Sequence, residues 1–314
     1  MKDNNLPKGI NRREFLQTSA KYSASAILAT MGVSNLFGAP RSPMVSTIEN
    51  VTLNNGVKMP ILGFGTLYLD GALGEKCVAD AISLGYRLID TATIYNNEEA
   101  VGAGIKRSGI EREKLFVTSK VWVDDSGYEK TKEAFETSLN KLGLDYLDLY
   151  LIHRPRGDVK GTWKAMEELY KEGRIRAIGV SNFEPHQIED LVNSGDVRPA
   201  VNQIETHVFF QQPGAHEFLQ RNEIQLEAWS PLAQGRNGHF TNQTLAEIGK
   251  KYNKNNAQVS LRWHYQRGIV AIPRSSQKAH MIENLNIFDF ELDDADMNTI
   301  SKLDLNRTQF PEWE

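Results

Sequence analysis

One segment decides the fold: residues 86–120, which read YRLIDTATIYNNEEAVGAGIKRSGIEREKLFVTSK. Two short apolar runs in it, Tyr86–Asp90 and Leu115–Lys120, are typical of buried strands, and Glu98–Arg107 between them has helical spacing. A strand, a helix and another strand in this order predict a β-α-β unit whose strands run parallel. We therefore expect a parallel sheet that is covered by helices.

The same alternation extends in both directions from this segment. Upstream, Ile61–Gly65 is predicted to be a strand and Gly71–Leu84 a helix, and downstream Lys130–Leu142 has helical spacing. The remaining predicted strands are Leu147–His153, Ala177–Ser181, Val201–Ile204, Ile224–Trp229 and Ile269–Ile272. Eight strands favour a closed (β/α)8 TIM barrel over an open doubly wound sheet, whose first turn is usually rich in glycine.

The limits of the barrel follow from the flanking sequence. Val51–Leu53 and Val57–Met59 enclose an Asn-Asn-Gly turn, which predicts a β-hairpin that caps the bottom of the barrel. No low-complexity linker interrupts the chain before Leu305. The simplest organisation is therefore a single α/β domain, residues 51–306, with a C-terminal tail, residues 307–314.

Composition narrows the choice of partners. The chain has 314 residues, of which 40% are hydrophobic, a net charge of -4 and a pI near 6.0. It has no surplus of positive charge to neutralise phosphates, so we expect no nucleic-acid partner. The single cysteine, Cys77, can form no internal disulfide and lacks the neighbours of a metal site, so no metal site is predicted.

The N-terminal residues 1–39 differ from the rest of the chain. Five basic side chains outnumber two acidic ones, and a weakly apolar run, Tyr22–Phe37, is shorter than a membrane span. Residues 11–17, NRREFLQ, resemble the bacterial twin-arginine export signal. We expect export to the periplasm with residues 40–50 as a linker and no membrane anchoring afterwards. The alternative is an N-terminal arm with two chance arginines on a cytoplasmic protein.

Polar residues stand where the predicted strands end. Asp90, Lys120 and His153 each close a strand, and Tyr95 follows Asp90 by five residues. In a parallel barrel these positions converge on the rim that carries active sites. A phenol that a nearby ammonium acidifies can donate a proton, and a histidine N–H can orient a carbonyl oxygen. A structural ion-pair network is the alternative, but it leaves Tyr95 unexplained.

Eight motifs, in order, resemble those of the aldo-keto reductases over Val51–Asn306. They are Gly63-Phe64-Gly65-Thr66, Leu88-Ile89-Asp90-Thr91-Ala92-x-x-Tyr95-x-Asn97-Glu98, Thr118-Ser119-Lys120-Val121-Trp122, Leu149-x-Leu151-Ile152-His153, Gly179-Val180-Ser181-Asn182-Phe183, Asn202-Gln203-Ile204-Glu205, Trp229-Ser230-Pro231-Leu232 and Ile272-Pro273-Arg274-Ser275. The resemblance implies NAD(P)H-dependent reduction of aldehydes or ketones to alcohols.

The resemblance also implies a role for individual residues. Tyr95 would donate the proton, Lys120 would lower its pKa, Asp90 would support Lys120, and His153 with Trp122 would bind the substrate. Trp229 would stack on the nicotinamide, and Arg274 would hold phosphate. The full set of implied cofactor contacts is Gly65, Thr66, Ser181, Asn182, Gln203, Trp229, Ser230, Leu232, Arg274, Ser275, Glu283 and Asn284.

Two departures from the family pattern affect specificity. Arg274 stands where relatives often have lysine, and His280 stands where many have the arginine that grips the extra phosphate, so NADPH is favoured with NADH as the alternative. Arg154 follows His153, where relatives often have an apolar, aromatic or amide residue. It is expected to touch an acidic or polyhydroxylated substrate, or else to form a surface salt bridge.

The substrate pocket is predicted only in outline. Its mouth is expected to be shaped by aromatic residues, namely Trp122, Tyr68, Phe209, Phe210 and the tail around Phe310–Trp313. The bacterial diketogluconate reductases look like near relatives, which favours keto sugars or keto acids. We expect a monomer. Two alternative functions are a catalytically silent cofactor-binding subunit and a non-redox isomerase, which would leave Trp229 and Gln203 without a role.

Overall fold

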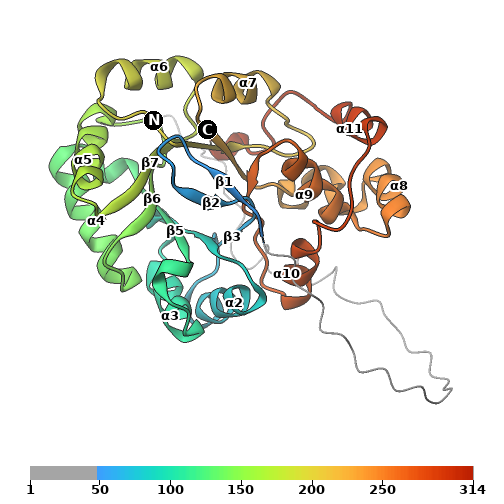
Figure 1. Ribbon diagram of the computed structural model, residues 1–314, viewed down its shortest axis with the longest axis horizontal. Helices are drawn as coiled ribbons and strands as arrows, with labels where there is room; N and C mark the ends of the chain where they lie inside the picture. The colour runs from blue at the N-terminus through green and yellow to red at the C-terminus, as the bar shows by residue number, and fades with distance from the viewer. Residues whose placement is uncertain (1–47, 314) are drawn as a thin grey trace, which may run out of the picture. The chain divides into compact units, whose positions relative to one another are not determined.

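Eight parallel strands form a closed barrel in the computed structural model, which describes residues 48–313 (Figure 1). The strands are β3 Gly63–Gly65, β4 Leu88–Asp90, β5 Phe116–Val121, β6 Leu147–Ile152, β7 Ile175–Ser181, β8 Val201–Glu205, β9 Gln225–Trp229 and β10 Val270–Ala271. They pair in chain order, and a parallel bridge between Leu62 and Ala271 closes the ring. The predicted TIM barrel is confirmed.

Helices follow most of the strands and surround the barrel. They are α2 Gly71–Leu84, α3 Glu98–Ser108, α4 Tyr128–Leu142, α5 Val159–Lys171, α6 Pro185–Ser194, α7 Pro213–Arg221, α8 Gln243–Tyr252, α9 Asn256–Gln266, α10 Lys278–Leu285 and α11 Asp294–Ser301. The helix predicted at Lys130–Leu142 begins two residues earlier, and Gly143 ends it in the left-handed conformation that glycine adopts without strain. Among the described residues, no helix is long and apolar enough to cross a membrane.

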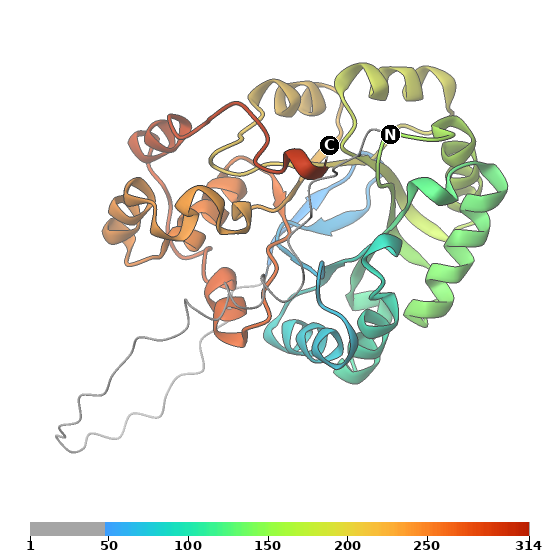
Figure 2. The same cartoon turned by 180° about the vertical axis from the view of Figure 1, so that it is seen from behind.

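The predicted hairpin closes the bottom of the barrel. Its strands, β1 Asn50–Thr52 and β2 Lys58–Pro60, pair antiparallel. Asn54 and Asn55 donate from their side chains to the carbonyl oxygens of Pro199 and Arg176, each 2.9 Å away, near the beginnings of two barrel strands. Figure 1 shows the hairpin across one opening, and Figure 2, seen from behind, shows the short C-terminal helix over the other.

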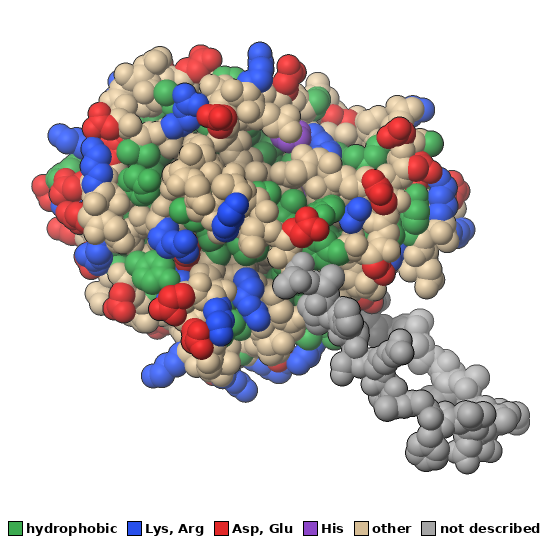
Figure 3. Space-filling view, viewed as in Figure 1, with side chains coloured by type: hydrophobic (Ala, Val, Ile, Leu, Met, Phe, Trp, Pro, Cys, Tyr) green, Lys and Arg blue, Asp and Glu red, His purple; other side chains and the backbone are tan. Residues whose placement is uncertain are grey.

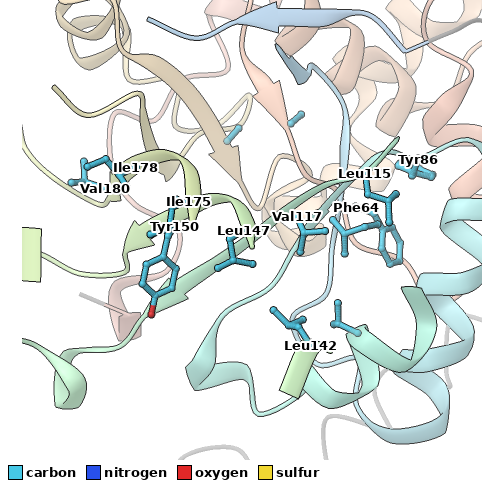
Figure 4. Packing of buried hydrophobic residues seen from close by; sticks show 14 of the residues in the cluster. Phe64, Tyr86, Leu115, Val117, Leu142, Leu147, Tyr150, Ile175, Ile178 and Val180 are labelled. Carbon is cyan, nitrogen blue, oxygen red and sulfur yellow. The ribbon is translucent and has the colours of Figure 1, made fainter. Parts of the chain in front are cut away.

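Two apolar layers support the barrel. Its lower interior holds Leu53 and Met59 of the hairpin region against strand residues such as Leu88 and Phe116. A larger cluster fills the space between strands and helices, where Figure 4 shows Val117 and Leu147 among its members. Removing these side chains from water supplies the main favourable free energy of folding.

Charged side chains of both signs are mixed on the surface. Figure 3 shows lysine and arginine side chains interspersed with aspartate and glutamate on the face that carries the hairpin. The predicted export signal at residues 1–39, and most of the predicted linker, lie outside the described residues.

Candidate active site

The barrel strands bring Asp90, Lys120 and Tyr95 together at their carboxyl ends. Lys120 Nζ lies 2.6 Å from Asp90 Oδ1 and 2.9 Å from the carbonyl oxygen of Thr91. The same ammonium donates a long hydrogen bond, 3.4 Å, to the Tyr95 hydroxyl. The side chain of Lys120 is completely buried, so these contacts are what compensates its charge.

A one-turn 3₁₀-helix, η1 Thr93–Tyr95, positions the phenol. Thr93 Oγ1 donates to the carbonyl oxygen of Lys120 at 3.0 Å, which ties the turn to β5. Asn96 ends the turn in the left-handed region at φ 53°, which asparagine tolerates better than most residues. The turn therefore holds Tyr95 beside Lys120 although the two residues lie on different connections of the barrel.

His153 completes the predicted group of four. Its ring packs edge-on against Tyr95, with centroids 5.7 Å apart, and against Trp122 at 5.1 Å. The Asn182 side-chain amide donates to the carbonyl oxygen of His153 at 3.2 Å. Burial, with the charges of Lys120 and Arg154, holds the pKa of His153 well below its usual value near 6.5. The ring is therefore neutral at pH 7, and one ring nitrogen can donate a hydrogen bond.

The pKa values of Tyr95 and Lys120 both rise. Burial raises the pKa of Tyr95 above 10; the charge of Lys120 opposes this rise and that of Asp90 adds to it. The sequence analysis predicts that Lys120 lowers the pKa of Tyr95. The charge of Lys120 does act in that direction, but burial of the phenol has the larger effect. For Lys120, burial lowers the pKa, yet Asp90 and Tyr95 together raise it above 10.5. Tyr95 therefore keeps its proton and Lys120 its charge at neutral pH.

A second buried carboxyl, Glu227, joins the network, and the sequence-based prediction missed it. Gln203 Nε2 donates to Asp90 Oδ2 and to Glu227 Oε2, each at 2.9 Å. Gln203 and Glu227 are register partners on β8 and β9. A signal was present, because Glu227 stands two residues before Trp229 and alternate strand residues share a face.

Ser181, Asn182 and Trp229 form a chain of hydrogen bonds beside His153. Ser181 Oγ donates to the carbonyl oxygen of Gln203 at 2.8 Å and accepts from Asn182 Nδ2 at 2.9 Å. Trp229 Nε1 donates to Asn182 Oδ1 at 2.8 Å. The predicted contacts for a nicotinamide are therefore brought to one place, next to the four candidate catalytic side chains.

The predicted phosphate residues follow β9 and β10. Ser230 adopts φ 49°, and Leu232 directly precedes the loop η4 Ala233–Thr241. Arg274 donates to the carbonyl oxygens of Leu67 at 3.2 Å and Tyr68 at 3.4 Å, and no carboxylate pairs with it within the described part of the chain. A guanidinium that no carboxylate neutralises can bind a phosphate group through charge-assisted hydrogen bonds.

The remaining predicted contacts are in β3, directly after it, and in or just before α10. A Cβ on Gly65 would lie 2.8 Å from the carbonyl oxygen of Ile272, so glycine permits β3 to approach this connection. Thr66 is fully buried and donates from its hydroxyl to the carbonyl oxygen of Asp90 at 2.8 Å. The other three predicted residues are Ser275, three residues before α10, and Glu283 and Asn284 on α10 itself.

The predicted pocket mouth needs correction at two aromatic residues, because Phe209 is almost completely buried and Phe310 is fully buried. Phe209 is only 4% exposed and packs with Val208, Ala233 and Trp263 in a separate apolar cluster, so it does not line the mouth. The prediction failed because an aromatic residue after a strand was assigned to the pocket without a partner for its ring. Tyr68, in contrast, is exposed.

The C-terminal tail packs over the site. Phe310 is fully buried, and its ring stacks on Trp313 with centroids 4.8 Å apart. Trp229 contacts both rings, at 5.3 Å and 5.4 Å. The buried carboxylate of Glu205 anchors the tail: it accepts from the Thr308 hydroxyl at 2.5 Å and from the backbone N–H of Gln309 at 2.8 Å. This anchor was also missed by the prediction.

The barrel and this rim together define a class of enzyme, and comparison with known proteins agrees with it. The sequence profile of the Aldo/keto reductase family matches residues 62–305, so the chain belongs to that family. Glyoxal reductase of Bacillus subtilis (strain 168) is 52% identical over 257 residues, which cover 81% of this chain and 92% of that protein.

Two further proteins support the same assignment. Methylglyoxal reductase DkgA of Escherichia coli (strain K12) is 41% identical over 265 residues, which cover 83% of this chain and 96% of that protein. The crystal structure of a Bombyx mori aldo-keto reductase in complex with NADP is similar with a TM-score of 0.80 and 34% identity, covering 85% of this chain and 97% of that one. The chain is thus an NAD(P)H-dependent oxidoreductase that reduces carbonyl groups to alcohols.

Proposed function

We propose that this chain reduces small dicarbonyl compounds of the glyoxal and methylglyoxal type, with Tyr95 as the proton donor. The observation that carries the proposal is the position of Lys120 between Asp90 and the Tyr95 hydroxyl, within the rim that also holds His153. The names of the two curated relatives supply the substrate class. Keto sugars and keto acids belong in the same substrate panel, because an aromatic pocket accepts them as well.

Each of the four side chains Asp90, Tyr95, Lys120 and His153 has its own role in the proposed reaction. Neutral His153 donates a hydrogen bond that orients the carbonyl oxygen beside Tyr95. NADPH, when bound, supplies the hydride that adds to the carbonyl carbon. The oxygen gains negative charge as the C=O π bond breaks, and it takes the proton of the Tyr95 hydroxyl to become the alcohol. Lys120, held by Asp90, stabilises the phenolate that remains until solvent returns a proton.

The residues of the site fit a phosphorylated nicotinamide cofactor. Ser181, Asn182 and Gln203 present amide and hydroxyl groups where a carboxamide can bind, and Trp229 presents its ring beside them. Arg274 has no carboxylate partner in the described region and would hold phosphate. We propose a preference for NADPH that falls sharply in Arg274→Ala. Equal or better turnover with NADH in the unmodified protein would contradict it.

The test of the reaction is Tyr95→Phe. The variant should fold and bind NADPH, measured by fluorescence titration, because only one hydroxyl is removed. It should lose nearly all oxidation of NADPH with methylglyoxal, on the order of 100-fold or more, since general acid catalysis contributes about that factor. Substantial remaining activity would show that another group supplies the proton. Tight NADPH binding without turnover in the unmodified protein would favour the silent binding subunit.

Export remains a proposal that the sequence supports. We propose that residues 1–39 direct the folded enzyme to the periplasm through their twin-arginine pair, Arg12 and Arg13. A fusion of residues 1–44 to a reporter that is active only outside the cytoplasm should be exported. Replacement of both arginines by lysine should stop export. Export that is unchanged would contradict the role of the twin-arginine pair, and absence of export from the start would place the enzyme in the cytoplasm.

A further inference from the structure

Glu227 is a fully buried carboxyl that the reaction described above does not use. It lies in β9 with no exposed surface. Oε2 accepts the hydrogen bond from Gln203 Nε2, whereas Oε1 is buried and has no hydrogen-bond partner among the described residues. A buried carboxylate oxygen without a partner is costly, and the cost falls when the group is protonated and neutral.

The charges around Glu227 do not balance if it is ionised. The neighbouring elements present Asp90 on β4, Tyr95 on η1, Lys120 on β5 and Gln203 on β8, while its register partner on β10 is the apolar Val270. Lys120 is the one cation of this group, and Asp90 already compensates it at 2.6 Å. An ionised Glu227 would leave one net negative charge buried in the barrel.

We propose that Glu227 is a positioning residue that stays protonated at neutral pH, holds the Gln203 amide in place and keeps the Asp90–Lys120–Tyr95 network free of net charge. One amide nitrogen of Gln203 donates to both carboxyl groups, so Glu227 fixes which way the amide faces. The kinetic part of this inference rests on the proposed function; the protonation state does not.

The electrostatics agree with the geometry. Burial raises the pKa of Glu227 to about 8, the charge of Asp90 adds to the rise, and the hydrogen bond from Gln203 and the charge of Lys120 oppose it. In return, negative charge on Glu227 raises the pKa of Tyr95 and that of Lys120. Ionisation of Glu227 in alkaline solution therefore makes Tyr95 hold its proton more tightly.

Infrared spectroscopy of the whole protein tests the protonation state directly. At pH 7 the carboxylic-acid C=O stretch of a protonated buried glutamate should be present, and it should disappear as the pH is raised through about 8. Glu227→Gln should lack the band. Glu98→Gln is the matched control, because Glu98 is also buried with one unpaired oxygen but binds Ser119 outside this network. A band lost in the control and kept in Glu227→Gln would overturn the inference, as would its absence from the unmodified protein.

The pH profile tests the coupling to Tyr95. Methylglyoxal reduction and oxidation of the corresponding alcohol are measured across alkaline pH for the unmodified protein, Glu227→Gln and Glu98→Gln. In Glu227→Gln, the part of the pH profile that reports the ionisation of Tyr95 should move to lower pH by roughly 0.5 to 1 unit. The reason is that the variant lacks the negative charge of ionised Glu227, which raises the pKa of Tyr95. Loss of rate by the same factor at every pH would mean a purely structural role.

The two tests separate the possible failures. If the unmodified protein reduces no carbonyl in the panel, the proposed function fails while the infrared titration still decides the state of Glu227. If Glu227→Gln does not fold, the titration of the band in the unmodified protein remains decisive. Absence of a protonated band at pH 7 contradicts the inference, and a band that persists to pH 10 would mean that Glu227 also stays neutral throughout the alkaline range.

Discussion

Lys120 is a buried cation whose charge is compensated entirely by protein groups. Its ammonium is inaccessible to water, and its compensation comes from Asp90, a carbonyl oxygen and a phenol. A buried cation tolerates the loss of its partner poorly, since the remaining charge has no solvent to screen it. Asp90 is therefore as necessary to the folded barrel as it is to the reaction.

Arg154 is expected to select substrates that carry a carboxylate. Its charge contributes to the lowered pKa of His153, which places it near the ring that orients the carbonyl. In Arg154→Gln, kcat/KM for 4-carboxybenzaldehyde should fall roughly tenfold while that for benzaldehyde changes little, because a charge-assisted contact is lost only for the acid. Steady-state kinetics with both aldehydes measure this.

Arg156 provides the control for that prediction. It lies on the same loop two residues further on and is exposed, so Arg156→Gln should leave the ratio between the two aldehydes unchanged. Equal losses for both aldehydes in Arg154→Gln would mean that Arg154 supports the loop and does not recognise the substrate.

Individual site residues could be predicted from the sequence where a polar residue type coincides with the end of a predicted strand. Asp90, Tyr95, Lys120 and His153 could be found because each is polar at a place where a barrel strand ends. Glu227 was missed: its spacing from Trp229 places both side chains on one face of the strand, but the sequence does not reveal the partner of its carboxyl group. Its partner, Gln203, stands on the neighbouring strand, and only the register of β8 and β9 joins them.

Among the structural elements, the tail and the loop η4 are joined by Arg236. Its guanidinium pairs with Glu312, donates to the carbonyl oxygen of Gln309 and lies 4.1 Å from the ring centroid of Phe310. Glu205 anchors the tail from the other side. The loop that follows the predicted cofactor residues is thus tied by direct contacts to the C-terminal tail.

Breaking this link should weaken substrate binding. Arg236→Gln should raise the KM for methylglyoxal by about threefold or more, since an exposed pair with additional ring contact contributes on the order of 1 kcal/mol. Glu312→Gln should have a smaller effect, because Arg236 keeps its other contacts. Steady-state kinetics of both single variants and the double variant check this.

The double variant should be no worse than Arg236→Gln alone, because the same link is lost once. Lys76→Gln is the control: it breaks a surface pair with Asp80 on α2, away from the tail and η4, and should leave KM unchanged. Additive effects of Arg236→Gln and Glu312→Gln would show that the two side chains act independently.

At the scale of the whole molecule, histidines that are buried or half-buried are expected to limit stability in acid. Burial lowers the pKa of His239 to about 3 and that of His216 to about 4, below the value near 6.5 of an unfolded chain. The unfolded state therefore binds more protons between pH 6.5 and 4, and the free energy of unfolding should fall as the pH falls through that window. Urea denaturation at several pH values measures the slope.

Two substitutions identify the source of this slope. His239→Asn should flatten it, whatever its effect on stability at neutral pH. His186→Asn should not, because His186 is exposed on α6. An unchanged slope in His239→Asn would assign the acid sensitivity to the other histidines with lowered pKa, such as His216 and His264, or to carboxyl groups.

The sequence was sufficient to predict the overall architecture but not the packing of individual side chains. Strand and helix alternation with eight apolar runs is sufficient for a barrel, and the Asn-Gly turn is sufficient for the hairpin. The environment of Phe209 was not accessible in this way, because its partners Val208, Ala233 and Trp263 come together only in the folded chain. Long-range packing determines whether an aromatic side chain after a strand faces a pocket or a core.

The seam that closes the barrel has a further consequence. β3 and β10 are among the shortest strands, and the parallel bridge from Leu62 to Ala271 joins them. Local opening should begin where the fewest backbone hydrogen bonds must break together. The amide hydrogens of Gly65 and Ala271 should accordingly exchange with deuterium sooner than those inside β5, β6 and β7. The barrel would then open locally next to Arg274, while the strand pairs around Lys120 keep their hydrogen bonds.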